Sequence, residues 1–150
     1  MHKINLLIDD KTNWRKKVPN LEKFVNRTLK SSVNSISAFK FKNIELTVLL
    51  TNTKNVKRLN FKYRKKNKDT DILSFPWEDK KFYKGKINKK NIYLGDLAIS
   101  YNYIKKQEEN FEVYLKKIMI HGFLHLIGYD HDNKKNYLKM EEKQKKILTL

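Results

Sequence analysis

The chain has 150 residues and contains no cysteine, which excludes a disulfide framework and any thiolate metal site. Its formal net charge of +18 favours a polyanionic partner such as nucleic acid, although most of the cations are lysines and an AT-rich genome would produce the same skew. No apolar stretch approaches the roughly 18 residues of a membrane-spanning helix and no secretory signal is visible, so we expect a cytoplasmic protein without membrane contacts.

The N-terminal half alternates predicted strands and helices. Apolar residues at every second position predict strands over residues 4–9 and 43–50. Apolar residues at helical spacing predict one helix over 18–32, with Pro19 in its first turn, and another over 51–64. A short strand over 70–76 is expected to end at its proline, because proline cannot donate a ladder hydrogen bond.

The C-terminal half is mainly helical after one further strand. Residues 78–90 are polar and rich in lysine, and we interpret them as a loop. Residues 91–100 predict a strand in which Gly95 indicates a bulge or a close backbone approach. The pattern is helical from Tyr101, and residues 118–127 are apolar on almost every side, which predicts a buried helix ending at Gly128. A last amphipathic helix is expected over 133–150.

These elements predict an α+β fold in one domain spanning residues 1–150. Strands and helices do not follow a regular βαβ series, so we expect a mixed sheet of roughly four strands packed with about four to five helices. A chain of this length can bury a core without disulfides or oligomerisation.

The segment HGFLHLIGYDH holds three of the four histidines of the chain. His121 and His125 are four residues apart on the predicted buried helix, so both project from one face, and Gly128 lets the chain turn so that His131 returns towards them. Three imidazoles with one coordination position left open are typical of a catalytic zinc ion. The alternative, histidines that only satisfy backbone carbonyls in the core, explains one such residue better than three at this spacing.

The spacing matches the three-histidine helix H-E-x-x-H-x-x-G-x-x-H of metalloproteases, except that Gly122 replaces the glutamate that serves as general base. Two carboxylates flank the third histidine. We predict that Asp132 caps the last helix. For Asp130, both a carboxylate that orients a ligand imidazole and a cap of that helix remain open. We interpret Tyr129 as a packing residue.

Three blocks together resemble the YbeY family, bacterial single-strand-specific metallo-endoribonucleases that act in ribosomal RNA maturation. They are HGFLHLIGYDH, LNFKYRKKNKDTDILSFP from Leu59 to Pro76, and LGDLAIS from Leu94 to Ser100. The resemblance covers most of the chain, and the first forty residues contribute least to it. Ile72 and the pair Leu97-Ala98 are conservative variants of the usual aliphatic residues.

The resemblance implies a zinc-dependent endoribonuclease with one Zn²⁺ held by His121, His125 and His131, and with Arg64 needed for activity. It further implies action in 16S rRNA 3′-end maturation and in ribosome quality control. The small ribosomal subunit, a small-subunit ribosomal protein and an assembly GTPase are the implied partners. One departure is that no acidic residue stands at about Val113 or Tyr114, which leaves that helix face without an obvious carboxylate near the metal.

A ribonuclease can function without the protease glutamate. Zinc alone lowers the pKa of a water ligand to about 7, and the transition state of phosphodiester cleavage gathers negative charge that a metal and an arginine both stabilise. We therefore predict metal-activated attack on the RNA phosphodiester, by water or by the 2′-hydroxyl, with Arg64 clamping the scissile phosphate.

Other residues of these blocks are candidates for substrate contacts. Direct substrate binding and a purely local structural role both remain open for three polar residues: Asp71, Ser74 and Asp96. Phe75 and Trp77 are candidates for stacking on unpaired bases, with core packing the alternative for Phe75, and the lysines over residues 80–90 are candidates for tracking the RNA backbone.

Two rival functions fit parts of the pattern. A non-catalytic ribosome-assembly factor with a structural metal explains the charge and the resemblance to ribosome-linked proteins, although a site with three ligands argues moderately against it. A metallopeptidase-like hydrolase shares the histidine spacing, but it lacks the glutamate and has no use for the positive charge.

Overall fold

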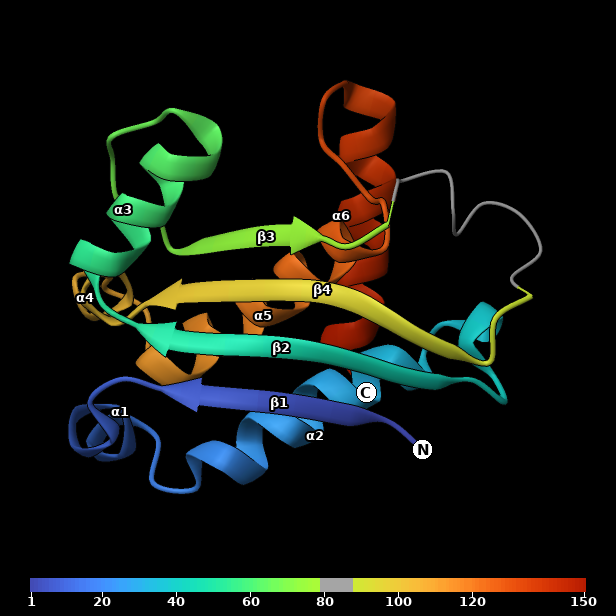
Figure 1. Cartoon of the computed structure of the whole chain (residues 1–150), viewed down its shortest axis with the longest axis horizontal. Helices are drawn as coiled ribbons and strands as arrows, with labels where there is room; N and C mark the ends of the chain where they lie inside the picture. The colour runs from blue at the N-terminus through green and yellow to red at the C-terminus, as the bar shows by residue number, and fades with distance from the viewer. Residues whose placement is uncertain (79–87) are drawn as a thin grey trace.

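The computed structural model describes residues 1–78 and 88–150. A four-stranded sheet has the order β1 (Lys3–Ile8), β2 (Asn43–Thr51), β4 (Asn91–Ser100) and β3 (Ile72–Pro76) (Figure 1). The first three strands in this order are parallel, and β3 is an antiparallel edge strand. The mixed four-stranded sheet of an α+β fold is therefore confirmed.

Six α-helices are present in the described residues, one more than the upper expectation: α1 (Lys11–Lys17), α2 (Leu21–Asn34), α3 (Thr53–Arg64), α4 (Tyr101–Lys105), α5 (Phe111–Leu126) and α6 (Lys134–Leu148). A single 3₁₀ turn, η1, spans Ser37–Phe39. Among the residues that are described, no helix combines the length and apolar character needed to cross a bilayer.

The helix α1 and the position of Pro19 differ from the prediction. α1 is seven residues long and strongly basic, and Trp14 is its only buried side chain, so no apolar periodicity marks it in the sequence. Trp14 packs edge-on against the aromatic rings of Tyr101 and Phe111, at centroid distances of 5.3 and 5.7 Å. Pro19 lies in the turn between α1 and α2 instead of in a first helical turn.

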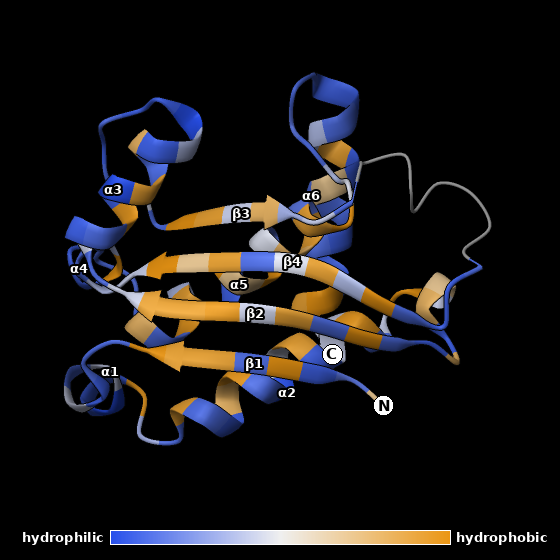
Figure 2. Cartoon of the chain, in the orientation of Figure 1, coloured by the Kyte–Doolittle hydropathy of each residue, from blue (hydrophilic) through white to orange (hydrophobic). Residues whose placement is uncertain are grey.

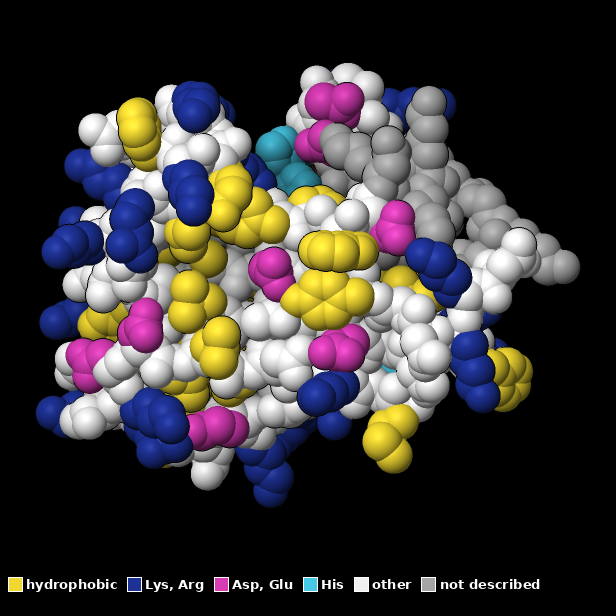
Figure 3. All heavy atoms as spheres, viewed as in Figure 1, with side chains coloured by type: hydrophobic (Ala, Val, Ile, Leu, Met, Phe, Trp, Pro, Cys, Tyr) yellow, Lys and Arg dark blue, Asp and Glu magenta, His cyan; other side chains and the backbone are white. Residues whose placement is uncertain are grey.

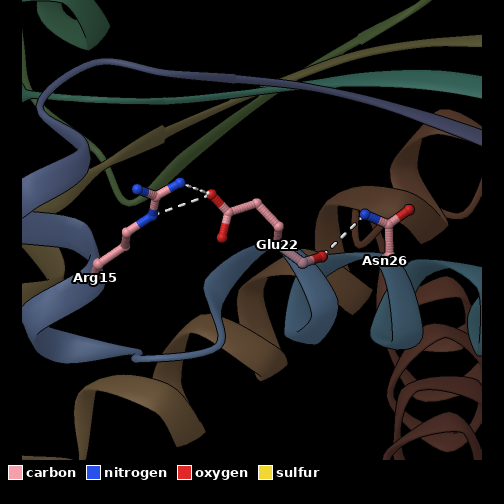
Figure 4. Close-up of polar contacts among 3 residues, drawn as sticks. All are labelled: Arg15, Glu22 and Asn26. Carbon is pink, nitrogen blue, oxygen red and sulfur yellow. Dashed lines mark hydrogen bonds and ion pairs between the residues drawn. The ribbon is translucent and has the colours of Figure 1, made fainter.

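An ion pair joins α1 to the first turn of α2, and a side-chain bond to the backbone lies within α2. The Arg15 guanidinium bonds the Glu22 carboxylate across the turn, and the Asn26 amide donates to the Glu22 carbonyl oxygen at 2.9 Å (Figure 4). The bond from Arg15 holds the pKa of Glu22 below its usual value. Because both groups are exposed to solvent, the pair fixes the geometry of the turn more than it stabilises the protein.

The main core lies between the sheet and a helical layer that contains α2 and α5 (Figure 1). Every second residue of β2, from Ile44 to Leu50, is buried against this layer, and Figure 2 shows the strands as the largest hydrophobic segments. The opposite face of the sheet is covered by α3 near β3 and β4, where Val56 packs with Leu73 and Ala98. α5 contacts β3 and β4 directly, so side chains from both elements can meet at the sheet edge.

Gly95 permits β4 to bend next to β3. The pairing of β2 with β4 shifts register here, and Gly95 has a φ of +135°. A Cβ atom at this position would lie 2.2 Å from the carbonyl oxygen of Phe75, closer than any real contact. The bulge and the close backbone approach expected at Gly95 are both confirmed.

Replacing Gly95 with alanine is therefore expected to lower the free energy of unfolding by about 2–4 kcal/mol, from left-handed backbone strain and from collision with the β3 backbone. Urea denaturation followed by far-UV circular dichroism measures this change. Lys90→Ala, at an exposed position just before the same strand, serves as the control and is expected to change stability by less than about 0.5 kcal/mol. Equal stability of the two variants would contradict the steric argument.

Candidate metal centre

The helix α5 delivers two histidines to the edge of the core. The Asn110 side chain caps its N-terminus by accepting from the Val113 N–H at 3.1 Å, and eight of its sixteen residues are buried. The chain reverses after the last turn of the helix. Gly128 has a φ of +101°, and the Tyr129 N–H donates to the Leu124 carbonyl oxygen at 3.0 Å. Helix termination next to Gly128 is thus confirmed, and the reversed chain leads directly to the third histidine.

The three predicted histidines come together. The ligand atoms of His121, His125 and His131 all lie within 4.8 Å of one another. The Nε2 atoms of His121 and His125 are 3.1 Å apart, and two nitrogens bound to one tetrahedral zinc, each at 2.0–2.1 Å, would lie about 3.3 Å apart. The fourth histidine, His2, is bonded instead to Asn34 and the Ile44 backbone, far away in the sequence and structure.

The other ring nitrogens of two histidines are anchored. The Nδ1 atom of His121 lies 3.3 Å from Oε1 of Gln144, and that of His125 lies 3.0 Å from the carbonyl oxygen of Tyr129. Both partners are acceptors, so each Nδ1 carries the proton. Each Nε2 lone pair then faces the space between the three histidines, where a metal ion would bind. This pattern of anchored rings is typical of metal-binding histidines, and the cluster fits one metal ion.

Burial keeps these imidazoles neutral. It lowers the pKa of His121. Burial first, and then the neighbouring His121 and His131, which disfavour another positive charge, together lower the pKa of His125 to about 4. A neutral imidazole is the form that binds a metal, so at pH 7 protons compete little for these two nitrogens.

Gly122 faces the sheet and has no room for a glutamate. A Cβ atom there would lie 2.5 Å from Cδ1 of Ile72 and 3.0 Å from Cδ2 of Leu97. The hydroxyl of Ser74 donates to the Gly122 carbonyl oxygen at 3.2 Å, so β3 and α5 are in direct contact here. The residue at the motif position of the protease glutamate, Gly122, therefore contributes to packing between α5 and the sheet.

A cavity of about 630 Å³ opens beside the histidines. This volume lies within the range of ligand-binding pockets, roughly 300–1,000 Å³. The cavity brings together most of the residues selected from the sequence, namely Arg64, Asp71, Ser74, His121, His125, Asp130 and His131. Figure 3 shows a histidine side chain in the notch between the lobe that contains α3 and the lobe that contains α6.

Arg64 enters this cavity from the last turn of α3. Its guanidinium donates to the Ser74 carbonyl oxygen at 2.5 Å and lies 5.5 Å from the ring centre of Phe75. The helix ends immediately afterwards, because Lys65 adopts a left-handed conformation. A guanidinium has five N–H donors, so one bond to the backbone holds Arg64 in place and leaves further donors for an anion.

Asp71 supplies the carboxylate that the sequence of α5 lacks. Its side chain accepts a hydrogen bond of 2.9 Å from the hydroxyl of Tyr114, and its charge acts on His121 to favour the protonated ring. Burial, together with the bond to Asp71, raises the pKa of the Tyr114 hydroxyl, which stays protonated. An acidic side chain was sought at about Val113 or Tyr114, but the structure provides it from the segment before β3 and uses Tyr114 to hold it.

Comparison with known proteins places these features in a family. A family model described as "Endoribonuclease YbeY" matches residues 8–150 of this chain. The chain belongs to the YbeY family. It is 44% identical to the Endoribonuclease YbeY of Pelagibacter ubique over 140 residues, which are 89% of this chain and 86% of that protein. It is 30% identical to the Endoribonuclease YbeY of Ehrlichia canis over 139 residues, with coverage of 90% and 84%.

A solved structure agrees with the fold of this YbeY chain. The solution structure of TM1509 from Thermotoga maritima has a TM-score of 0.57 and 27% sequence identity, and the match covers 97% of this chain and 86% of that chain. The family resemblance predicted from three sequence blocks is thus confirmed over nearly the full length.

Several predicted residues of the YbeY chain lie elsewhere. Asp96 is on the sheet face that α3 partly covers, where it accepts a hydrogen bond from the Tyr93 hydroxyl, and it does not line the histidine cavity. Trp77 is on the same face, 70% exposed and edge-on to Tyr93. Phe75 packs against the small cluster beneath α3. The predicted lysine-rich loop over 80–90 lies outside the described residues except for its last three positions.

The two aspartates beside His131 have different roles from each other. Asp130 lines the cavity, and its carboxylate accepts from the backbone N–H of His131 at 2.8 Å. The prediction that Asp132 caps α6 was wrong by one residue. Asn133 is the cap, since its side chain accepts from the Asn136 N–H at 2.8 Å, while Asp132 bonds the Asn136 side-chain amide.

Proposed function

We propose that this protein is a zinc-dependent endoribonuclease that cleaves single-stranded RNA. The observation that carries the proposal is the meeting of three histidines, two of them with anchored rings, with Arg64 and Asp71 in one cavity. Membership of the YbeY family, whose curated relatives carry the name endoribonuclease, supports RNA as the substrate. We further propose a cytoplasmic role in 16S rRNA 3′-end maturation and ribosome quality control, with the small ribosomal subunit, one of its proteins and an assembly GTPase as partners.

The chain supplies binding and charge stabilisation around the scissile phosphate. A metal bound by the histidines supplies Lewis-acid stabilisation of the charge that develops on phosphoryl oxygens. Arg64 binds the same phosphate through the donors that its bond to Ser74 leaves available. The bond to Ser74 and the contact with Phe75 hold the guanidinium in position, so little side-chain entropy is lost when the phosphate binds.

We further propose that Asp71 accepts the proton of the attacking hydroxyl group. Its carboxylate is held by the Tyr114 hydroxyl, which remains a donor because burial raises its pKa. We expect Asp71→Asn to retain metal and to lower the cleavage rate by about 10²-fold, the lower end of general-base effects. Asp96→Asn is the matched control on the opposite face of the sheet, and single-turnover cleavage of a labelled RNA compares them. Equal rates for the two variants would remove Asp71 from the reaction.

The cleaved ends distinguish two forms of the proposed reaction. Attack by water leaves a linear phosphate, whereas attack by the neighbouring 2′-hydroxyl first leaves a 2′,3′-cyclic phosphate. RNA with a 2′-deoxy nucleotide at the cleaved position gives an independent answer, because only the second route needs that hydroxyl. Cleavage of the deoxy-substituted RNA at an unchanged rate would exclude the 2′-hydroxyl as nucleophile.

Metal removal tests the proposal against a non-catalytic assembly factor. The core around α5 consists of apolar side chains, and the His121 and His125 rings are anchored by Gln144 and Tyr129. We therefore expect chelated protein to keep its far-UV circular dichroism and one cooperative unfolding transition while RNA cleavage stops. Cleavage that returns with added Zn²⁺ completes the result. Loss of the folded state on chelation, with no RNA cleavage before it, would instead indicate a structural metal.

A further inference from the structure

A second cavity lies on the other side of the histidines. It has a volume of about 350 Å³ and lies between α5 and α6. It shares four lining residues with the larger cavity: Lys117, His121, His131 and Gln144. The histidine cluster therefore borders both cavities, and we name the smaller one the α6 groove.

The α6 groove has a partly apolar wall that comes from one face of α6. Tyr137, Met140, Gln144 and Leu148 follow helical spacing and all line it. Met140 is buried, whereas Tyr137 is 50% exposed although it borders a cavity. An aromatic side chain that lies on a groove wall and remains half exposed offers a surface for another flat group.

The charged residues of the groove match a nucleotide better than a purely apolar ligand. Lys117 lies at the junction of the two cavities and pairs with Glu109 at 2.5 Å, and Lys145 pairs with Glu141 at 3.3 Å. These exposed pairs hold both ammonium groups near the groove but contribute little stability, so a phosphate can compete for them. The groove thus combines an aromatic wall with two lysines at its rim, each paired with a glutamate, and Glu141 also lines it.

We propose that the α6 groove binds an unpaired nucleobase of the RNA, next to the scissile phosphate, with the base stacked on Tyr137. This inference rests on the proposed ribonuclease function and adds the path that the RNA strand takes across the site. Arg64 lies in the larger cavity and Tyr137 in the α6 groove, so the RNA strand crosses the histidine cluster from α3 towards α6. A base in a duplex is stacked on both faces and cannot enter, so the groove selects single-stranded RNA.

The test uses a short single-stranded RNA in which one abasic nucleotide is moved through the positions around the cleaved bond. For the wild type, the abasic nucleotide at one position is expected to lower kcat/KM by about 10-fold, the usual effect of losing one stacked base. Tyr137→Ala is expected to lower kcat/KM on the complete RNA by the same factor, and to show no further loss with the abasic RNA. Tyr137→Phe, which keeps the ring, restores most of the rate.

Leu138→Ala is the matched control, because Leu138 is 52% exposed on the same helix and does not line the groove. A binding measurement in the presence of chelator removes cleavage from the readout. RNA with 2-aminopurine at the identified position is expected to lose fluorescence on binding to the wild type and to Leu138→Ala, but not to Tyr137→Ala.

Three results would overturn the inference. If Tyr137→Ala and the abasic nucleotide reduce kcat/KM independently, so that their effects multiply, the base does not stack on Tyr137. If the wild type cleaves RNA and Tyr137→Ala cleaves and quenches equally well, the groove is not a base subsite, while the ribonuclease function stands. If the wild type neither binds nor cleaves RNA, the proposed function fails and the subsite fails with it.

Discussion

Replacing His125 with alanine is expected to remove the bound metal and to lower the rate of RNA cleavage by about 10³-fold or more. His125 is the central residue of the histidine cluster, since its Nε2 lies 3.1 Å from that of His121 and its ring is also next to His131. A catalytic metal supplies several kcal/mol of transition-state stabilisation, and about 4 kcal/mol corresponds to about 10³-fold in rate. Metal content and cleavage of a labelled single-stranded RNA are measured on the same preparation.

The control for this variant is His2→Ala. His2 is the one histidine outside the cluster, and its ring nitrogens bond Asn34 and the Ile44 N–H, so its replacement should leave both metal and rate unchanged. Both variants and the wild type are purified side by side, because a contaminating nuclease would cleave RNA in all three preparations. Full activity in a His125→Ala preparation shown to be free of metal would contradict the metal-dependent mechanism.

Replacing Arg64 with alanine is expected to leave the metal in place and to lower the cleavage rate by about 10²–10³-fold, the effect of losing one preorganised charge donor at an anionic transition state. The loss should appear in kcat more than in KM, because the charge on the phosphoryl oxygens increases in the transition state. Arg64→Lys is expected to recover only part of the rate, since an ammonium group lacks the planar fork that holds two phosphoryl oxygens while another donor bonds the Ser74 carbonyl.

Arg58→Ala is the matched control for Arg64. It removes the same charge from the same helix, but Arg58 bonds the side chain of Asn55 and does not line the cavity. Steady-state kinetics at two salt concentrations separates the specific role of Arg64 in catalysis from the general effect of removing one positive charge. The general effect weakens RNA binding in a salt-dependent way. An Arg64→Ala enzyme with the kcat of Arg58→Ala would show that Arg64 only joins α3 to β3.

The strands and the histidine helix could be predicted because their signals are local. Alternating apolar residues mark β2, the nearly uniform apolar stretch marks α5, and the spacing of His121, His125 and His131 brings their rings together through helix geometry and one glycine turn. α1 was missed because it is short and buries only Trp14. Its stability depends on the Tyr101 and Phe111 rings, which come from distant parts of the chain.

The rest of the site depends on tertiary contacts that spacing does not encode. Nothing within α5 indicates that Asp71 reaches Tyr114, which is 43 residues away. The position of Arg64 in the cavity was expected only from the family resemblance, since an arginine at the end of a basic helix is ordinarily exposed. Asp96 belongs to a recognisable block but points to the other face of the sheet, because side chains alternate along β4.

The packing at Gly122 also bears on how the metallopeptidase motif and the motif of this family, which share the histidine spacing, could interconvert by mutation. A glutamate at this position would require the side-chain ends of Ile72 and Leu97 to move, and overpacking of this kind costs about 1–3 kcal/mol. Peptidase and ribonuclease helices differ by one letter in their motif, and in this chain a change of that letter alone is expected to lower stability unless Ile72 or Leu97 changes with it.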